Sequence, residues 1–362
     1  MVSTRRYSVI KGTGTYIPEV IIKNDFFLDY RFFGKDGRPV MKSNAEIIEK
    51  FKEITEIEER RYAEPQHNTS DLGYFSALEA IEDAGIDPEN LDYIIVAHNF
   101  GDVYHGNSAV DMMPTIAARI KKKLGIKNPN TIAYDLPFGC PGWVQAMIHA
   151  DYFLKSGDAN LALVIGAETL SRISDPHDID SMIYSDGAGA TILQAEESSE
   201  PVGIIAHKTR SDTIEHCKLL WMDKSNNPEY QTNELFIKML GHKVYEYAIT
   251  YVPILVKECI EKAGVGIRDI KKILVHQANG KMDSVILQKT LKKFGLNDTP
   301  EHIMPMIISR LGNNSVATVP VLLDFVRKNK MENHAISPGE HMVFASVGAG
   351  MNINAIVYKV PE

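Results

Sequence analysis

Apolar residues follow two patterns along this chain. Short continuous apolar runs predict strands buried on both faces, as in parallel sheets, and apolar residues that recur every three or four positions predict helices. Strands that alternate with helices at these lengths predict an α/β protein. The predicted strands cover residues 7–11, 93–97, 131–134, 160–165 and 185–193, and the predicted helices cover residues 45–55, 71–84, 114–124 and 144–153.

The chain contains an internal repeat, which is its strongest architectural signal. Residues 80–101 align without gaps to residues 259–280, and both copies read as a helix, a glycine, a polar turn and a buried strand. Glycine at the end of a helix commonly takes a left-handed conformation, so both helices are expected to stop there. Seven residues of the first copy recur in the second: Ile81, Glu82, Ala84, Gly85, Ile94, Val96 and Gly101.

The remainder of the second half also echoes the first. A predicted strand over 303–308, followed by a turn and a helix, resembles a strand and helix of the first half, and a predicted closing strand over 342–347 resembles another. We therefore expect two pseudo-symmetric lobes, 1–196 and 197–362. Residues 205–240 are less regular and read as an insertion at the start of the second lobe.

Composition narrows the classes of function. The 362 residues are 44% apolar and 24% charged, as in globular proteins, and a net charge of −8 argues against general nucleic-acid binding. Cys140, Cys217 and Cys259 are odd in number and widely spaced, which fits a reducing compartment without disulfides. We expect a cytoplasmic protein without a metal site, because the sequence has neither a metal-binding motif nor an apolar run of bilayer length.

One cysteine lies between a predicted strand and a predicted helix. Pro141, directly after Cys140, suits the start of a helix, and Gly139 and Gly142 allow a sharp turn and the close approach of a ligand. A thiol at a helix N-terminus experiences the positive end of the helix dipole, which is expected to lower its pKa and favour the thiolate. Most single cysteines only pack, but this placement indicates a nucleophile.

His276 and Asn313 are the candidate partners of this cysteine. His276 follows the predicted strand over 273–275, and Asn313 lies in a turn before a helix. Taken alone, a strand-end histidine is usually a packed residue, and an asparagine in a turn is usually a cap. Pseudo-symmetry would bring the strand ends and helix starts of both lobes to one place, so we expect the three side chains to meet.

Six stretches of the chain carry a family resemblance. They are ITEIEERRYAE (54–64), the strand-to-helix turn at Cys140, YSDGAGATIL (184–193), HQAN (276–279), LGNNSVATVP (311–320) and VGAGMN (347–352). Together they resemble β-ketoacyl-acyl carrier protein synthase III of the thiolase superfamily. Each motif alone is weak, but their order is specific and the resemblance spans nearly the whole chain.

The resemblance implies a thiolase-like fold with five αβαβα layers and a decarboxylating Claisen condensation in fatty-acid or related lipid or polyketide synthesis. Cys140 would carry the acyl group as a thioester, and the N–H groups of Cys140 and Ala349 would hold the oxyanion. His276 and Asn313 would donate hydrogen bonds to the carbonyl oxygen of a malonyl thioester. No cofactor is implied other than the thioester substrates, on coenzyme A or on a carrier protein.

The resemblance further implies a homodimer formed through the first lobe, in which a loop of each subunit reaches the acyl pocket of the other. That loop corresponds to residues 98–113, a long polar stretch. Met112 or Met113 is the expected intruding side chain, although methionine also serves as ordinary packing. Phe138 stands where the family has a small residue, so it should reshape the acyl pocket.

Docking of an acidic acyl carrier protein is implied at basic residues outside the tunnel. Lys281 matches such a position, and Lys292 and Lys293 are further candidates, although exposed lysines on a helix are usually only solvated. The tryptophan and arginine with which the family holds coenzyme A are replaced by Lys50 and Ile54. The acyl donor is therefore open between coenzyme A and a carrier protein.

These departures suggest a specialised ketosynthase, for example one of dialkylresorcinol-type synthesis that uses β-keto thioesters. Two other classes remain as alternatives. Cys140, His276 and Asn313 stand in the order found in papain-like proteases, but here the flanking strands belong to a repeated α/β body. A non-catalytic partner subunit is the other alternative, and the retained cysteine, histidine and asparagine argue against it.

Overall fold

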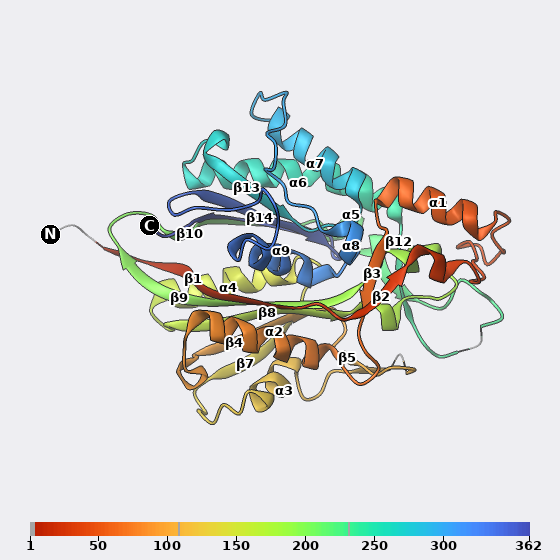
Figure 1. Cartoon of the computed structure of the whole chain (residues 1–362), viewed down its shortest axis with the longest axis horizontal. Coiled ribbons are helices and arrows are strands. Elements are labelled where there is room, and N and C mark those ends of the chain that lie inside the picture. The colour runs from red at the N-terminus through yellow and green to blue at the C-terminus, as the bar shows by residue number, and fades with distance from the viewer. Residues whose placement is uncertain (1–3, 108, 231) are drawn as a thin grey trace.

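Two sheets lie one above the other, with helices between them and on both outer faces (Figure 1). The computed structural model describes residues 4–107, 109–230 and 232–362. The outer helices are α2 (Thr69–Ala84) and α3 (Ile116–Lys123) on the first sheet and α6 (Gly241–Ala263) and α7 (Gly280–Lys292) on the second, and the inner helices are α4 (Gly142–Ser156) and α9 (Thr318–Arg327). The layers therefore follow the order αβαβα, as the resemblance implied.

The four strands of the second sheet follow the topology of the first four strands of the first sheet. The first contains, in spatial order, β1 (Arg5–Tyr16), β9 (Asp186–Ser198), β8 (Leu161–Thr169), β4 (Tyr93–His98) and β7 (Ile132–Pro137), and the second contains β10 (Gly203–Ser211), β15 (Asn352–Lys359), β14 (His341–Gly348) and β13 (Ile270–Val275). β4 is parallel to β7 and β8, and β13 is parallel to β14, whereas β9 and β15 are antiparallel to both of their neighbours. The predicted lobe boundary after residue 196 lies near the end of β9.

The central core fills the space between the sheets. Trp143 and Met147 of α4 and Leu322 of α9 pack there with strand residues such as Val164 and Phe344. All nine residues of β8 are buried, because helices cover both faces of the strand. This burial explains the continuous apolar run in its sequence.

The internal repeat is confirmed in local structure. Gly85 and Gly264 both end their helices in the left-handed conformation, with φ of 62° and 70°. A short 3-10 turn follows each, η2 (Pro88–Asn90) in the first copy and η6 (Ile267–Asp269) in the second, before β4 and β13 begin.

The predicted strand over 303–308 is wrong. Residues 303–307 are irregular, and α8 (Ile308–Leu311) begins at the last predicted position. Ile303 accepts one hydrogen bond from β13, but the buried Gln277 side chain takes the N–H groups of Ile307 and Ile308 and donates to the carbonyl of Pro305. The Gln277 side chain thus makes the hydrogen bonds to main-chain groups that a neighbouring strand would make in a sheet.

Two boundaries in the second lobe also differ from the predictions. The sheet closes with β15, which follows the strand expected to be last. Residues 203–211 form β10, the edge strand of the second sheet, so the insertion begins after them and not at residue 205. It contains α5 (Thr213–His216), η5 (Cys217–Leu219) and the hairpin of β11 (Leu220–Asp223) and β12 (Phe236–Met239).

The strand before Cys140 is an edge strand, not a buried one. Among the strands of the described residues, β7 pairs only with β4, and Ile132 in it is 49% exposed. Its apolar residues Ala133, Tyr134 and Leu136 are only partly covered. This edge of the first sheet therefore offers unpaired main-chain groups and apolar surface.

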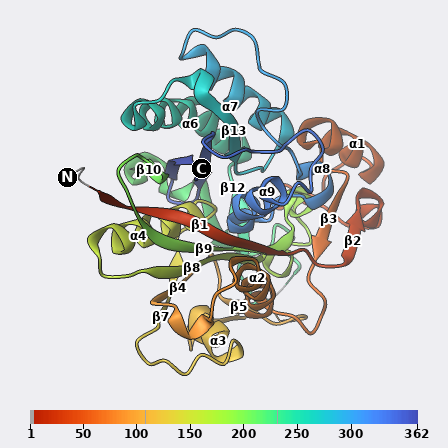
Figure 2. The ribbon, with the colours of Figure 1, turned by 60° about the vertical axis from the view of Figure 1, so that its left-hand side comes forward.

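Residues 20–62 form a cap at one end of the molecule (Figure 2). It holds β2 (Val20–Lys23), η1 (Asn24–Phe27), α1 (Asn44–Thr55) and β3 (Glu59–Tyr62), and its Phe27 and Phe51 form one apolar cluster with Met182 and Ile308. Ser43 and Glu46 form a capping box at the start of α1. Within the described ranges, none of the helices combines the length and the apolar character that crossing a membrane requires.

Candidate active site

Cys140, His276 and Asn313 line one cavity of about 410 Å³ between the two lobes. Further polar residues line the same cavity, among them Asn99, Ser315 and Asn352. No Asp, Glu, Lys or Arg is among its described lining residues. Most of its wall is apolar and includes Phe100, Phe138, Leu170, Leu220, Trp221, Met222, Ile237 and Met239. In the described part of the chain, no group of His, Cys, Asp and Glu is arranged to hold a metal ion.

Cys140 lies at the turn from β7 into α4. Pro141 is the N-cap of α4, so the cysteine stands just before the first helical turn. A loop of the other lobe packs directly against this turn. A Cβ on Gly139 would lie 3.0 Å from the Ala349 nitrogen, and one on Gly348 would lie 2.7 Å from the Cys140 nitrogen, so the approach requires glycine at both positions.

This close approach brings two main-chain donors together. The Ala349 nitrogen lies beside Gly139, which directly precedes Cys140. Among the described residues, neither the N–H of Cys140 nor that of Ala349 donates a hydrogen bond to another residue, and the N–H of Cys140 faces its own sulfur. Two unused N–H groups beside a thiol form the arrangement that stabilises an oxyanion.

The thiol itself is not acidic in the resting protein. Burial raises the pKa of Cys140 to about 11, and a hydrogen bond of 3.3 Å from the Ser315 hydroxyl to Sγ acts in the opposite direction. The expectation of a lowered pKa is therefore wrong, because removal of the thiolate from water outweighs the favourable donors around it. The resting nucleophile is a thiol that must lose its proton when it reacts.

His276 follows β13 and faces the cavity from the second lobe. Its main-chain N–H donates to the carbonyl of Ala345 in β14, which fixes the residue at the sheet end. Burial lowers the pKa of His276 to about 4, and only the main chain of Ser315 opposes this shift. The imidazole is consequently neutral, and its Nδ1 has no hydrogen-bond partner in the described structure.

Asn313 has an amide orientation that the main chain determines. Its Oδ1 accepts the N–H of Ser315 at 2.9 Å. Its own N–H donates to Ile183, and its carbonyl accepts from Ser185, so the residue is held on both sides. Because the oxygen is occupied, the Nδ2 donors are the part of the amide available to a ligand in the cavity.

A second cavity of about 520 Å³ connects the first to the surface cap. The two share Met239, Val244, Ala278, Met282 and Asn313 in their walls. The second is lined on its other side by α1, where Lys50 and Ile54 are half exposed. Together the two cavities form a channel that runs from α1 past α7 to Cys140.

The three candidate docking lysines lie at opposite ends of α7. Lys281 is in its first turn, next to the channel residue Met282, and pairs with Glu53 of α1 at 3.6 Å. Lys292 and Lys293 are at the far end, about 16 Å away along the helix axis. Cations there complement the negative end of the helix dipole, which accounts for them without a ligand.

Of the three residues predicted to line the acyl pocket, one lines the cavity and two do not. Phe138 lines the cavity, as expected. Met112 and Met113 do not line the cavity of their own chain, and Met113 is 87% exposed. Both lie on the loop 98–113, in which Ser108 falls outside the described residues.

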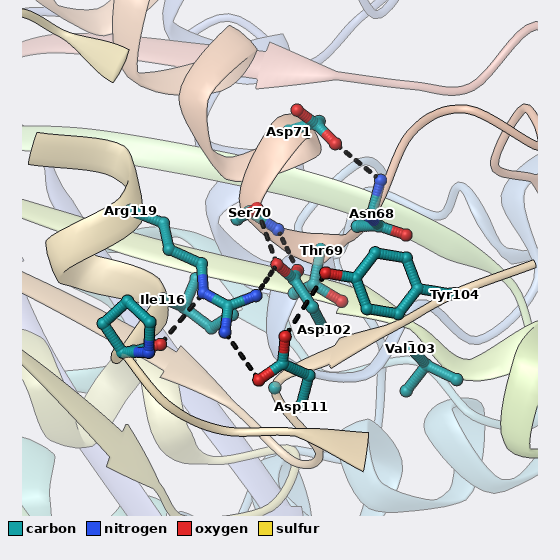
Figure 3. Close-up of polar contacts among 12 residues, drawn as sticks. Asn68, Thr69, Ser70, Asp71, Asp102, Val103, Tyr104, Asp111, Ile116 and Arg119 are labelled. Atoms are coloured by element: carbon teal, nitrogen blue, oxygen red, sulfur yellow. Dashed lines mark hydrogen bonds and ion pairs between the residues drawn. The ribbon is translucent and has the colours of Figure 1, made fainter. Parts of the chain in front are cut away.

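The loop that carries these methionines is firmly anchored (Figure 3). Arg119 of α3 contacts Asp102 at 2.6 Å and Asp111 at 2.8 Å, so one guanidinium joins the two ends of the loop. Asp102 also accepts two hydrogen bonds from Ser70 at the start of α2. The two ends of the loop form a short hairpin of β5 (Asp102–Val103) and β6 (Val110–Asp111).

Asn99 and Ser315 are site residues that the sequence reasoning did not single out. Ser315 lies in the GNNS motif, two residues after Asn313, and Asn99 follows the first-lobe strand of the repeat. Both positions carry the signal that identified His276 and Asn313, namely a polar residue at a strand end or helix start. The contact between them joins residues 216 positions apart, which sequence periodicity does not reveal.

Comparison with known proteins agrees with this geometry. Family models for the two parts of 3-oxoacyl-[acyl-carrier-protein] synthase III match residues 134–213 and, for the C-terminal part, residues 260–360. The β-ketoacyl-[acyl carrier protein] synthase III of Thermus thermophilus is 28% identical, with a TM-score of 0.79 over 97% of this chain and 98% of that one. The enzyme of Aquifex aeolicus VF5 is 26% identical, with a TM-score of 0.78 over 97% and 99%.

A priming β-ketosynthase from the R1128 polyketide biosynthetic pathway is also similar. It is 25% identical, with a TM-score of 0.79 over 100% of this chain and 98% of that chain. The matched family models include the turn at Cys140 and the segments of His276 and Asn313. The chain therefore belongs to the 3-oxoacyl-[acyl-carrier-protein] synthase III family and is a decarboxylating condensing enzyme of fatty-acid or polyketide synthesis.

Proposed function

We propose that Cys140 holds the acyl group of an incoming thioester and that His276 and Asn313 promote the loss of carbon dioxide from a malonyl thioester. The observation that carries this proposal is the convergence of the three side chains on one uncharged cavity at the end of a channel. No further cofactor enters these steps.

Acyl transfer uses the first-lobe side of the cavity. The sulfur of Cys140 attacks the thioester carbonyl, and the N–H groups of Cys140 and Ala349 hold the resulting oxyanion. Cys140 starts as a thiol, and its proton leaves with the departing thiol of the donor. The products are an acyl-Cys140 thioester and the free thiol of the donor.

Decarboxylation uses the second-lobe side. Neutral His276 and the Nδ2 group of Asn313 donate to the thioester carbonyl of the malonyl group, which becomes an enolate as carbon dioxide leaves. A cavity without charged walls gives the malonyl carboxylate no ion partner, so its loss as neutral carbon dioxide is favoured. The enolate carbon then attacks the acyl thioester and releases Cys140, which regains a proton from the solvent.

An acyl carrier protein is the expected bearer of the malonyl group. Lys281 supports this role because it lies at the channel entrance. The exposed Lys50, which pairs with Glu53, stands where the family has an aromatic clamp for coenzyme A, so a carrier protein is favoured as the acyl donor too. A cytoplasmic location would suit both substrates.

A homodimer would complete the acyl pocket. The half-exposed edge strand β7 offers a pairing surface, and the anchored loop presents Met113 to the exterior on the same lobe. A second copy across this face would receive Met112 or Met113 in its acyl pocket beside Phe138. The specialised dialkylresorcinol-type reaction with β-keto thioesters stays a prediction.

Intact-mass spectrometry tests the central assignment. The protein is mixed with a panel of acyl-coenzyme A and acyl-carrier donors, and the mass gain of one acyl group is followed. Wild type is expected to gain this mass, and Cys140→Ala is expected to lose it completely, whereas Cys217→Ala serves as the matched control. Full acylation of Cys140→Ala would overturn the assignment.

A further inference from the structure

A chain of hydrogen bonds links a buried carboxyl group to the sulfur of Cys140. Glu168 of β8 is 1% exposed, and its Oε2 accepts both the main-chain N–H of Asn99, at 3.0 Å, and the Asn99 side-chain amide. The Asn99 amide nitrogen also donates to the Ser315 hydroxyl at 2.9 Å. The Ser315 hydroxyl in turn donates to Cys140 Sγ at 3.3 Å.

The direction of these hydrogen bonds follows from the number of protons available. An asparagine amide nitrogen carries two hydrogens, and Glu168 Oε2 takes one of them while the Ser315 oxygen takes the other. Because the Ser315 oxygen already accepts, its single hydrogen is left to point at the sulfur. The chain therefore presents a hydrogen-bond donor to Cys140.

We propose that Ser315 is the side-chain donor that stabilises the negative charge on Cys140 Sγ, and that Asn99 and Glu168 are positioning residues that orient its hydroxyl. The charge appears twice in the reaction, once when the sulfur attacks the acyl donor and once when it leaves the condensation product. The inference rests on the proposed role of Cys140 as the acyl carrier.

The chain is a device for orientation and not a proton relay. An amide nitrogen does not readily pass on a proton, so Asn99 separates Glu168 from the hydroxyl of Ser315. The thiol proton therefore leaves with the departing thiol, as in the acylation step above. The number of protons on Asn99 and Ser315 stays the same throughout.

The main chain at Ser315 is held in place independently of its hydroxyl. Ser315 has a φ of 52°, in the left-handed region that residues other than glycine rarely adopt. Its N–H donates to Oδ1 of Asn313, which fixes that conformation. Serine and alanine carry the same strain at this position, so Ser315→Ala removes the donor without changing the conformational preference of the main chain.

Glu168 has two opposing effects on the thiol. As an acceptor it orients Asn99, which supports the donor at Sγ, but its negative charge raises the pKa of Cys140. Burial raises the pKa of Glu168 itself to about 7, while the nearby His98 lowers it and Asp186 raises it further. Replacement by glutamine removes the charge and keeps an acceptor, whereas replacement by leucine removes both, so the pKa of Cys140 should be higher in the leucine variant than in the glutamine variant.

The test measures the pH dependence of alkylation at Cys140. Iodoacetamide is added to the full-length protein, and the Cys140 peptide is quantified by mass spectrometry, separately from Cys217 and Cys259. Ser315→Ala is expected to slow alkylation near pH 8 about tenfold, because one pKa unit changes the thiolate fraction tenfold. Ser346→Ala, which removes a buried hydroxyl without a hydrogen-bond partner in the described structure, is the matched control and should change nothing.

Two further comparisons test the positioning residues. Asn99→Leu should slow alkylation severalfold in the wild-type background and have little further effect in Ser315→Ala, since both act through one hydroxyl. Glu168→Gln should alkylate as fast as wild type or faster, and Glu168→Leu should alkylate more slowly than Glu168→Gln, because both lack the charge and only the leucine variant lacks the acceptor. If Glu168→Leu does not fold, the Asn99 and Ser315 cycle still decides the question.

Two outcomes would overturn the proposal: an unchanged alkylation profile in Ser315→Ala, or additive effects of Asn99→Leu and Ser315→Ala. Alkylation requires no acyl substrate, so this result is independent of the acylation assay. Failure of Cys140 to accept an acyl group would instead contradict the proposed function.

Discussion

The two copies of the internal repeat have the same framework but use the ends of their strands differently. In the first lobe β4 ends in Ala97 and His98, and the aligned residues after β13 in the second lobe are His276 and Gln277. His98 and Gln277 are both buried and spend their polar atoms on the surrounding structure. His276, one position earlier, faces the cavity.

The difference lies in what packs against the preceding position. Ala97 lies under the start of α4, because a Cβ added to Gly142 would lie 3.0 Å from the Cβ of Ala97. A histidine would not fit there, because the nucleophile's helix occupies the space. The equivalent position of the second lobe faces the cavity, so His276 is free to meet the substrate. The repeat thus conserves the scaffold, while packing decides which strand end carries chemistry.

The largest expected effect is a difference in decarboxylation between variants of His276 and of His98. His276→Ala or Asn313→Ala should lower decarboxylation of a malonyl-carrier thioester by about 100-fold or more, because each removes a donor to the developing enolate. Both variants should still gain an acyl group on Cys140. Carbon dioxide release and intact mass measure the two steps separately.

His98→Ala is the matched control for this experiment. It removes a histidine at the corresponding sheet end without touching the cavity, so carbon dioxide release by the folded protein should stay near that of wild type. If His98→Ala were as inactive as His276→Ala, the functional difference between the two strand ends would be refuted.

The next prediction concerns stability, for which the Gln277 side chain should matter more than that of His98. Gln277→Ala should lower the free energy of unfolding by about 3 kcal/mol, because it leaves the buried main-chain groups of Pro305, Ile307 and Ile308 without partners. His98→Ala should cost less, about 2 kcal/mol, since Asp135 keeps the N–H groups of Ile116 and Ala117. Denaturant unfolding measures both, and a larger loss in His98→Ala would contradict this account.

The pH dependence of His276 gives a third test. With a pKa of about 4 in the folded protein against 6.5 for the free side chain, the unfolded chain takes up this proton first. The contribution of His276 to stability should therefore decrease as the pH falls from about 6.5 to about 4. His276→Gln should remove this part of the pH dependence.

The rate of decarboxylation should also depend on the protonation of His276. Decarboxylation needs the neutral imidazole, so its rate should be constant above about pH 5 and fall as the pH approaches 4. Rapid single-turnover measurement avoids loss of protein by acid unfolding. A midpoint near 6.5 would show that the imidazole is not desolvated in the working enzyme.

Local patterns predicted the framework of this fold, because each depends on few residues. Gly85 and Gly264 stop their helices through their own conformational freedom, and the strands after them are buried in both copies. The repeat also led to the expectation that Cys140, His276 and Asn313 would meet, which the cavity shows.

The predictions failed where a distant side chain decides the outcome. The apolar run at 303–308 resembles a strand, but Gln277 satisfies its main chain instead. The pKa of Cys140 depends on burial, and the orientation of Ser315 depends on Asn99, and neither relation is visible in sequence spacing.

The smallest expected effect concerns the residues that directly follow the two copies of the repeat, Asp102 and Lys281. Asp102 follows the first copy, where it is buried and holds Arg119, whereas Lys281 follows the second copy and is 51% exposed at the channel entrance. Lys281→Glu should raise the KM for a carrier-protein substrate severalfold at low salt with little change in kcat, because a rim charge acts mainly on association.

The effect should fade at high ionic strength, since salt screens exposed charges. Lys292→Glu is the matched control, with the same charge change about 16 Å further along α7, and it should have a smaller effect. An equal rise in KM for both variants would show that the carrier protein responds to net charge and not to the entrance. An effect confined to Lys281 would place the carrier protein where α1 and α7 open the channel to Cys140.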